Sequence, residues 1–523
     1  MGKVSIPKAG SIGVVRDVAA HDLPPAAWTD AKNVRFRNGS ASQFLGHGRV
    51  YGDIAVEPYH VLPVQVGAQS YWLYAGERKI FAATIEDGAP VHTNITRQAA
   101  GNDVSYKGKP NVWTSTLLSG VPILNPGNEV DPPQQWSMDP AARCTKLDNW
   151  PAGLFCKSLR AYRNFLVALN ITRDGQNLPY MVKWSSAADP GAVPATWDEA
   201  DEDQDAGETD LAEGGDRIVD GLQLRDSFMI YKEASVWRMD YTGGPFVFSF
   251  RKVLGLSGAM NRNCIVELDG WHFVLTGSDV VVHDGQSATS VLDDVAREAL
   301  FQDMDAAYND RAFVFKNPFL NEVFVCYVAI GATAPNKALV WNYKDRTVTY
   351  REMPNVHHAA CGPVDNTLNN GWSSMTDPWE TAQTKWNQPA SIPNLVRVLM
   401  ASQGSSLLLL DSAATFDGVP VTAYLERSGL SFGEPDYTKR VTSVRPRITG
   451  SAGATVLMRI GGHMSDPAAD PDYGDPIPFV IGETIALDCF ADWRYIAIRF
   501  ESGTASAWKL DSYDLEVQRG SRW

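Results

Sequence analysis

Long apolar runs and clustered cysteines are both missing from this sequence of 523 residues. No apolar stretch reaches the roughly 18 residues that a membrane-spanning helix requires, and residues 1–20 lack the apolar core of a signal peptide. We therefore expect a protein that is made and kept in a cytoplasm. The six cysteines are scattered without a short metal-type spacing, a pattern that predicts free, mostly buried thiols.

Basic residues are also in short supply. Lys and Arg number 46 against 61 Asp and Glu, which gives a formal net charge of −15. Affinity for phosphate comes from clustered Lys and Arg, so this composition argues against a surface that grips nucleic acid. The acidic excess peaks in residues 198–216, where ten acids occur without one base. A core cannot absorb that charge, and we expect a solvated, uncompensated acidic loop.

Recognisable motifs of catalysis and cofactor binding are absent. No Gly-x-Ser-x-Gly, phosphate loop or dinucleotide glycine pattern stands between a strand and a helix. Asp201, Asp203 and Asp205 imitate the first ligands of a calcium loop, but Ala206 replaces the turn glycine and Ala212 the bidentate glutamate. The calcium interpretation therefore fails at two positions.

Two further fragments have simpler explanations. Asp174 and Gly175 faintly resemble an Asp box, but their spacing is that of a β-turn. His357 and His358 are neighbours, and neighbouring residues on a strand point to opposite faces, so they do not form a metal site together. We predict a protein that is not an enzyme and has no catalytic, cofactor-binding or metal-binding residues.

The residues that are plentiful favour an all-β fold. Aromatics make up 10% of the chain, with 16 Trp, and 43 Gly and 31 Pro provide frequent turns. Alternating runs with a central turn predict hairpins at residues 71–81, 228–237 and 271–285. Further β-rich segments are residues 112–136, 159–184, 312–329 and 338–351.

Sheet units that recur every 30 to 60 residues predict a β-propeller of about six or seven blades over residues 59–411. Residues 1–58 should form an extended N-terminal arm with the first strands. We expect residues 1–50 to be ordered mainly by packing on the propeller or on a neighbouring subunit. Residues 290–304 carry the best helical pattern, and residues 361–393 the composition of a loop or linker. Residues 412–523 alternate with a two-residue period and predict a C-terminal β-sandwich.

The opening of the chain resembles that of tail nozzle proteins of short-tailed bacteriophages, a family that includes tail tubular protein B and packaged-DNA stabilisation protein. The resemblance is carried by the succession GVVRD (13–17), LPP (23–25), WTD (28–30) and NVRFRNG (33–39). In physical terms this is an extended arm, a proline-fixed turn and a strand that ends in an Asn-Gly hairpin turn. Similar segments follow at residues 113–115, 121–125, 131–136, 163–170, 182–185, 194–198, 206–208, 228–238, 241–248, 425–433 and 511–518.

The resemblance implies a structural virion protein that is assembled in the host bacterial cytoplasm. Such nozzles are homo-hexamers that carry a β-propeller, dock on the tail adaptor below the portal, retain the packaged genome and conduct DNA during ejection. Implied partners are the adaptor, tail needle, fibre or spike proteins, the host envelope, and double-stranded DNA that passes without specific binding. The acidic segment 198–216 would then line the channel or its rim, where carboxylates repel phosphate, or would be an outer solvated loop without a role.

Two other classes remain open on the sequence. A carbohydrate-active propeller or tail-spike depolymerase would need carboxylates and aromatic platforms in one cleft, and the 16 Trp make this conceivable. Trimeric assembly and activity on capsule or lipopolysaccharide would distinguish it. A bacterial propeller scaffold for other proteins is the third class, and it lacks the phage-like opening at residues 13–39.

Overall fold

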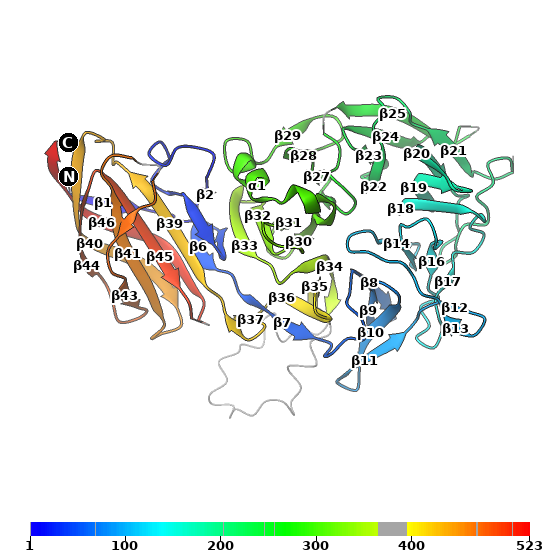
Figure 1. Ribbon diagram of the computed structural model, residues 1–523, viewed down its shortest axis with the longest axis horizontal. Helices are drawn as coiled ribbons and strands as arrows, with labels where there is room; N and C mark the ends of the chain where they lie inside the picture. The colour runs from blue at the N-terminus through cyan, green and yellow to red at the C-terminus, as the bar shows by residue number, and fades with distance from the viewer. Residues whose placement is uncertain are drawn as a thin grey trace.

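Short alternating strands joined by tight turns build the whole molecule (Figure 1). The computed structural model describes residues 2–522 apart from 68, 202, 245, 256, 365–394, 467–468 and 505. Seven sheets in this described part, each antiparallel in its four principal strands, surround one axis as the blades of a β-propeller, and two further sheets form a β-sandwich beside it. The all-β propeller predicted from the sequence is confirmed, and the number of blades is seven.

Each of the first five blades is a four-stranded sheet whose strands follow one another in the chain. They comprise β8 (His60–Val66), β9 (Gln69–Ala75), β10 (Ile80–Glu86) and β11 (Ala89–Asn94); β14 (Thr114–Leu118), β15 (Val121–Asn125), β16 (Gln134–Gln135) and β17 (Thr145–Lys146); β18 (Leu154–Tyr162), β19 (Phe165–Arg173), β20 (Gln176–Trp184) and β21 (Gly207–Asp210); β22 (Ile218–Leu224), β23 (Ser227–Lys232), β24 (Ser235–Tyr241) and β25 (Phe248–Gly255); and β26 (Ile265–Leu268), β27 (Trp271–Leu275), β28 (Val280–His283) and β29 (Ala288–Ser290). The pair β12 (Gln98–Ala99) and β13 (Asn102–Asp103) lies between the first two blades in the chain.

The last two blades recruit strands from the N-terminal segment. Blade six contains β30 (Phe313–Asn317), β31 (Glu322–Tyr327), β32 (Lys337–Asn342) and β33 (Thr347–Glu352), and is extended by β2 (Gly13–Val14) and β3 (Ala27–Trp28). Blade seven contains β34 (Val356–Val364), β35 (Leu395–Ser402), β36 (Ser406–Ala413), β7 (Gly46–Val50), β37 (Thr415–Phe416) and β38 (Val419–Pro420). Because β7 pairs with β36, the chain before the first blade completes the last one and ties the ends of the ring together.

The sandwich is also built from both ends of the chain. One sheet contains β1 (Lys3–Ile6), β5 (Val34–Arg37), β6 (Ser40–Gln43), β40 (Tyr437–Gly450), β44 (Leu487–Trp493) and β46 (Trp508–Arg522). The other contains β4 (Asp30–Lys32), β39 (Ala423–Leu430), β41 (Thr455–His463), β42 (Asp472–Tyr473), β43 (Ile477–Val480) and β45 (Tyr495–Ser502). Both termini lie at the end of the sandwich that is farthest from the propeller (Figure 1).

Residues 3–50, expected as an arm, thus form seven strands, each of two to five residues, in sheets of both domains. Strands this short are not stable alone and are held by the longer strands beside them. Trp28 is buried between the domains: its indole Nε1 donates a 2.5 Å hydrogen bond to the carbonyl of Ala9, and its ring lies 6.0 Å from Tyr513 and 6.4 Å from Phe500. One continuous apolar core joins the sandwich to blades five and six.

The predicted helix and the free cysteines agree with the structure, whereas the predicted loop does not begin where it was expected. A helix occurs inside the predicted window, as α1 (Arg297–Asp303), followed by the 3-10 turn Ala306–Arg311. The predicted loop at 361–393 begins inside β34, which continues to Val364, and its remainder lies outside the described residues. All six cysteines are free, and four of them are buried. No helix in the described part of the chain is long and apolar enough to cross a membrane.

Candidate functional site

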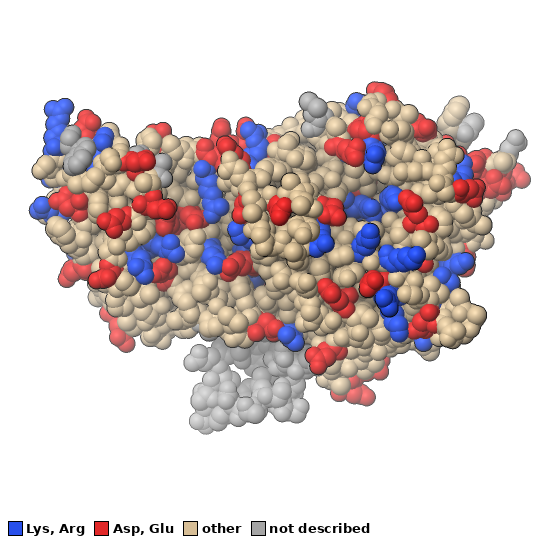
Figure 2. All heavy atoms as spheres, in the orientation of Figure 1, with Lys and Arg blue, Asp and Glu red and all other residues tan. Residues whose placement is uncertain are grey.

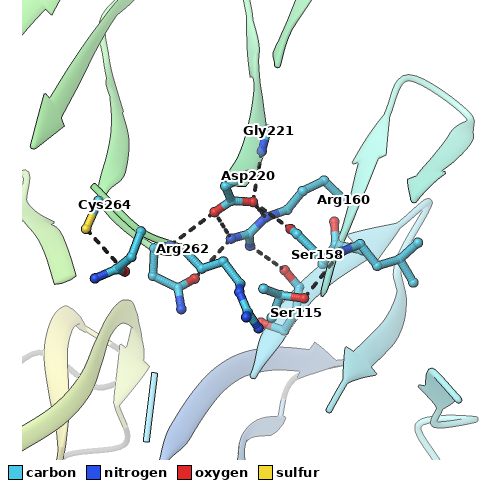
Figure 3. Close-up of polar contacts among 12 residues, drawn as sticks. Ser115, Ser158, Arg160, Asp220, Gly221, Arg262 and Cys264 are labelled. Atoms are coloured by element: carbon cyan, nitrogen blue, oxygen red, sulfur yellow. Dashed lines mark hydrogen bonds and ion pairs between the residues drawn. The ribbon is translucent and has the colours of Figure 1, made fainter. Parts of the chain in front are cut away.

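The inner strands of the blades carry polar side chains to the propeller axis (Figure 3). Asp220, on β22, accepts hydrogen bonds from Ser158 Oγ at 2.6 Å and from Arg160 Nε at 2.9 Å, both on β18. Arg160 Nη2 reaches the second carboxylate oxygen at 2.7 Å, which makes the ion pair bidentate. Burial alone would raise the pKa of Asp220, but Arg160 and the hydrogen bonds hold that pKa below its usual value.

This network connects several blades. The backbone N–H of Asn263, just before β26, donates to Asp220, and the Asn263 amide donates to Asn111 Oδ1 at 3.0 Å. Arg160 also donates to the carbonyl of Ser115 on β14 at 3.1 Å. Both oxygens of Asp220 are therefore occupied by protein donors, and the carboxylate is poorly placed to take a proton from a substrate. The arrangement fixes blades two to five to one another.

A pocket of about 120 Å³ remains on the axis beside this ion pair. His358 lines it and lies against His60, with ring centroids 3.9 Å apart, and His60 Nε2 is 2.7 Å from Ser115 Oγ. Burial lowers the pKa of His358 to about 3 and holds the pKa of His60 well below its usual value, so both rings are neutral near pH 7. A space of this size holds only a few water molecules.

A second polar cluster joins the sandwich to the propeller. Arg35, on β5, donates to both carboxylate oxygens of Glu322 on β31, at 2.5 and 3.0 Å, and to Asp411 on β36 at 2.5 Å. Arg351, on β33, donates to the other oxygen of Asp411 at 2.8 Å. The ring of Phe44 lies 4.4 Å from the guanidinium of Arg35 and 4.7 Å from that of Arg351. We call these four charged residues the interdomain cluster.

The interdomain cluster contains two cations and two anions that are nearly inaccessible to water. Buried charges of this kind persist only when they are paired, and removing one partner leaves an uncompensated charge. Asn33, in the same N-terminal segment, adds a hydrogen bond from its side-chain amide to the carbonyl of Thr422 at 2.8 Å. The motif NVRFRNG is therefore the place where the N-terminal segment locks the two domains together.

The acidic segment 198–216 differs from the prediction in one respect. Part of it is the strand β21 at the outer edge of blade three, and three of its acids have buried or half-buried basic partners. Lys183 Nζ pairs with Glu199 and Glu208, and Arg173 pairs with Glu208. Burial alone would raise the pKa of Glu208, but the hydrogen bonds from Arg173 and Lys183 lower it.

The third acid, Asp216, pairs with Lys232, whose side chain is fully buried under residues 211–216. Its ammonium donates to the carbonyls of Leu211 and Glu213 and to Asp216 Oδ1, at 2.8, 2.9 and 2.8 Å. For these three acids the expectation of an uncompensated loop was wrong, because their bases come from β19, β20 and β23. The remaining described carboxylates are largely exposed, and acidic side chains gather at the propeller edge beside β21 (Figure 2).

The smaller sequence fragments take ordinary structural roles. Asp174 and Gly175 form the two-residue turn of the β19–β20 hairpin, both with positive φ. His357 bonds Glu57 at 2.8 Å while His358 faces the axial pocket, so the two histidines do point in opposite directions. Within the described residues, no group of three or more His, Cys, Asp or Glu could hold a metal ion. Asp201, Asp203 and Asp205, which the structure describes, form no such group.

The polar networks at the axis and between the domains were not found from the sequence. The sequence does contain a signal for them, because charged residues occur within mostly apolar strands. Asp220 lies within the inner strand IVDGLQL, and Arg35 lies between Val34 and Phe36. A charged residue at an inward strand position requires a buried partner. The sequence could not name that partner, because Arg35 and Glu322 are 287 residues apart.

No known protein family and no curated protein sequence matches the chain. Among solved structures it is similar to a fungal alcohol oxidase of the AA5 family in complex with copper, at 10% identity and a TM-score of 0.38, covering 90% of this chain and 93% of the other. It is also similar to an exo-β-1,3-galactanase from Phanerochaete chrysosporium, at 9% identity and a TM-score of 0.29, covering 91% and 100%. A WD40 domain of coronin from Toxoplasma gondii matches at 7% identity and a TM-score of 0.35, covering 75% and 87%. Similarity this low carries no information about activity.

Proposed function

We propose that this chain is a non-catalytic subunit of a short-tailed bacteriophage virion, the tail nozzle. Six copies would form a ring on the tail adaptor below the portal, retain the packaged genome and conduct DNA during ejection. The observation that carries the proposal is the role of the segment that resembles nozzle proteins. Residues 13–39 supply strands to the sandwich and to blade six, and they supply Arg35 to the interdomain cluster. A part that must withstand the passage of DNA benefits from two domains that move as one body.

The state of the propeller axis is consistent with such a role. The axial pocket beside Arg160 and Asp220, of about 120 Å³, is too small to admit a nucleic acid, and Asp220 is neutralised by Arg160. In the proposed ring, the path for DNA would run between the six copies and not through any one propeller. A net charge of −15 per copy would limit adhesion of passing phosphates to the walls.

The decisive experiment is a cryo-EM reconstruction of the tail of virions that contain this chain. We expect sixfold density for the chain next to the adaptor, and a purified protein that is largely monomeric in solution before it meets the adaptor. Threefold or twelvefold density would contradict the proposal. Release of sugar fragments from capsule or lipopolysaccharide by the purified chain would favour the tail-spike depolymerase instead.

A further inference from the structure

A second and larger pocket, of about 560 Å³, lies between blades five and six. Its size falls in the range of about 300–1,000 Å³ that is typical of small-molecule sites. Three aromatic side chains line it: Trp271 at the start of β27, Trp341 on β32, and Tyr343 in the turn that follows β32. Leu268, with two valines of blade five and its exit segment, adds apolar surface. We call this space the blade five–six pocket.

The aromatic wall is partly fixed before any ligand binds. Trp341 stacks on Phe273 with ring centroids 5.4 Å apart and an angle of 23°, and Tyr343 lies 6.3 Å from Trp341. Trp271 is 43% exposed, so its indole is accessible to a ligand. Because the wall is already ordered, the protein loses less conformational entropy when a ligand binds there.

Polar groups around this wall have no protein partner. Among the described residues, the side chains of Asp269 and Arg346 make no hydrogen bond or ion pair, although both line the pocket. The hydroxyl of Tyr343 is likewise unengaged, and burial, together with nearby Asp269, raises its pKa, so it remains a neutral donor near pH 7. The axial cluster differs in this respect, because there each oxygen of Asp220 is already bonded. The blade five–six pocket therefore combines apolar faces with free donors and acceptors.

We propose that the blade five–six pocket binds a neutral oligosaccharide. The apolar C–H faces of a sugar ring can cover Trp271 and Trp341, and removing that area from water is favourable. Its hydroxyl groups can bond the carboxylate of Asp269 and the guanidinium of Arg346, which accept and donate respectively. The two charges are opposite, so the pocket offers no net attraction to an anion or a cation.

The proposed activity is binding without cleavage. Asp269 is the one carboxylate among the described residues that line the pocket, whereas glycoside hydrolysis generally uses a pair. The inference does not depend on the nozzle assignment, because it rests only on the lining of this pocket. A saccharide-binding protein could be a virion subunit or not.

The test starts with the full-length protein on a printed array of neutral and charged oligosaccharides, followed by calorimetric titration with the strongest neutral binder. We expect binding of at least one neutral oligosaccharide, with an affinity that falls about tenfold or more in Trp271→Ala, since the exposed indole supplies much of the contact area. Asp269→Asn should weaken binding less, and it suits the backbone because Asn tolerates the positive φ of 47° at this position. Neither change removes a buried side chain.

The matched control is Phe490→Ala, which removes an exposed aromatic on β44 of the sandwich, 71% accessible and remote in sequence from the pocket. This variant should bind as the unchanged protein does. Failure of the protein to bind any neutral oligosaccharide on the array would overturn the proposal. Equal affinity of Trp271→Ala and the unchanged protein would also overturn it, because the ligand would then occupy another site. Neither result would bear on the sixfold ring, which is tested by reconstruction of the tail.

Discussion

A buried chain of hydrogen bonds between blades four and five should make the protein sensitive to acid. The N–H of Gly285 donates to His283 Nδ1 at 3.1 Å, so His283 carries its proton on Nε2 and donates to the hydroxyl oxygen of Tyr231 at 2.6 Å. Tyr231 in turn donates to His272 Nδ1 at 2.6 Å, and His272 Nε2 donates to the carbonyl of Gln223 at 3.0 Å. When both histidines are neutral, each hydrogen-bond donor in this chain faces one acceptor. A proton added to either ring would place two donors face to face.

The size of the effect follows from the pKa values. Burial lowers the pKa of His272 to about 3 and that of His283 to about 4, whereas histidine in an unfolded chain titrates near pH 6.5. Below pH 6.5 the unfolded chain binds more protons than the folded one, so stability falls as the pH falls toward the folded-state values. At pH 5 each histidine lowers the free energy of unfolding by about 2 kcal/mol relative to pH 7.

The assay is urea unfolding at pH 7, 6 and 5 for the unchanged protein and for the double variant His272→Gln, His283→Gln. The double variant should lose stability at pH 7, yet its change between pH 7 and pH 5 should be smaller by about 4 kcal/mol, since two titrating groups are gone. His21→Gln, which alters an exposed histidine, should follow the unchanged protein. An identical pH dependence in the double variant and the unchanged protein would refute the reasoning.

Three further results are expected. Glu322→Gln should lower the free energy of unfolding by about 3–5 kcal/mol, measured by chemical denaturation, because it leaves the two buried guanidiniums of the interdomain cluster with one carboxylate, that of Asp411. A loss below about 1 kcal/mol would mean that water reaches the cluster and compensates the unpaired charge. Trp28→Ala should cost about 3–5 kcal/mol in the same assay, through a cavity between the domains, and an unchanged midpoint would contradict the continuous core. Replacing four acids with Asn or Gln, namely Asp201, Glu202, Asp203 and Asp205, should slow single-particle DNA ejection from intact virions if this segment lines the channel. Unchanged rates would exclude the channel position.

Local sequence patterns predicted much of the secondary structure. The β9–β10, β23–β24 and β27–β28 hairpins occur where alternation and turn residues predicted them, because register and turn type are set by a few adjacent residues. The Asn38-Gly39 turn between β5 and β6 is of the same kind, with positive φ at both residues. The strands of the C-terminal sandwich also follow their two-residue period, since one face of each sheet is buried.

The sequence by itself therefore determined where many strands and turns lie and that the fold is all-β. It also showed that no recognisable catalytic motif is present. Only the tertiary structure decided the number of blades, because closing a ring depends on how sheets pack and not on any one of them. It also decided which charges are paired: Lys232 meets Asp216 and Arg35 meets Glu322 through contacts between separate strands. The blade five–six pocket belongs to the same category, since Trp271 and Trp341 come from different blades and share a wall only after those blades pack together.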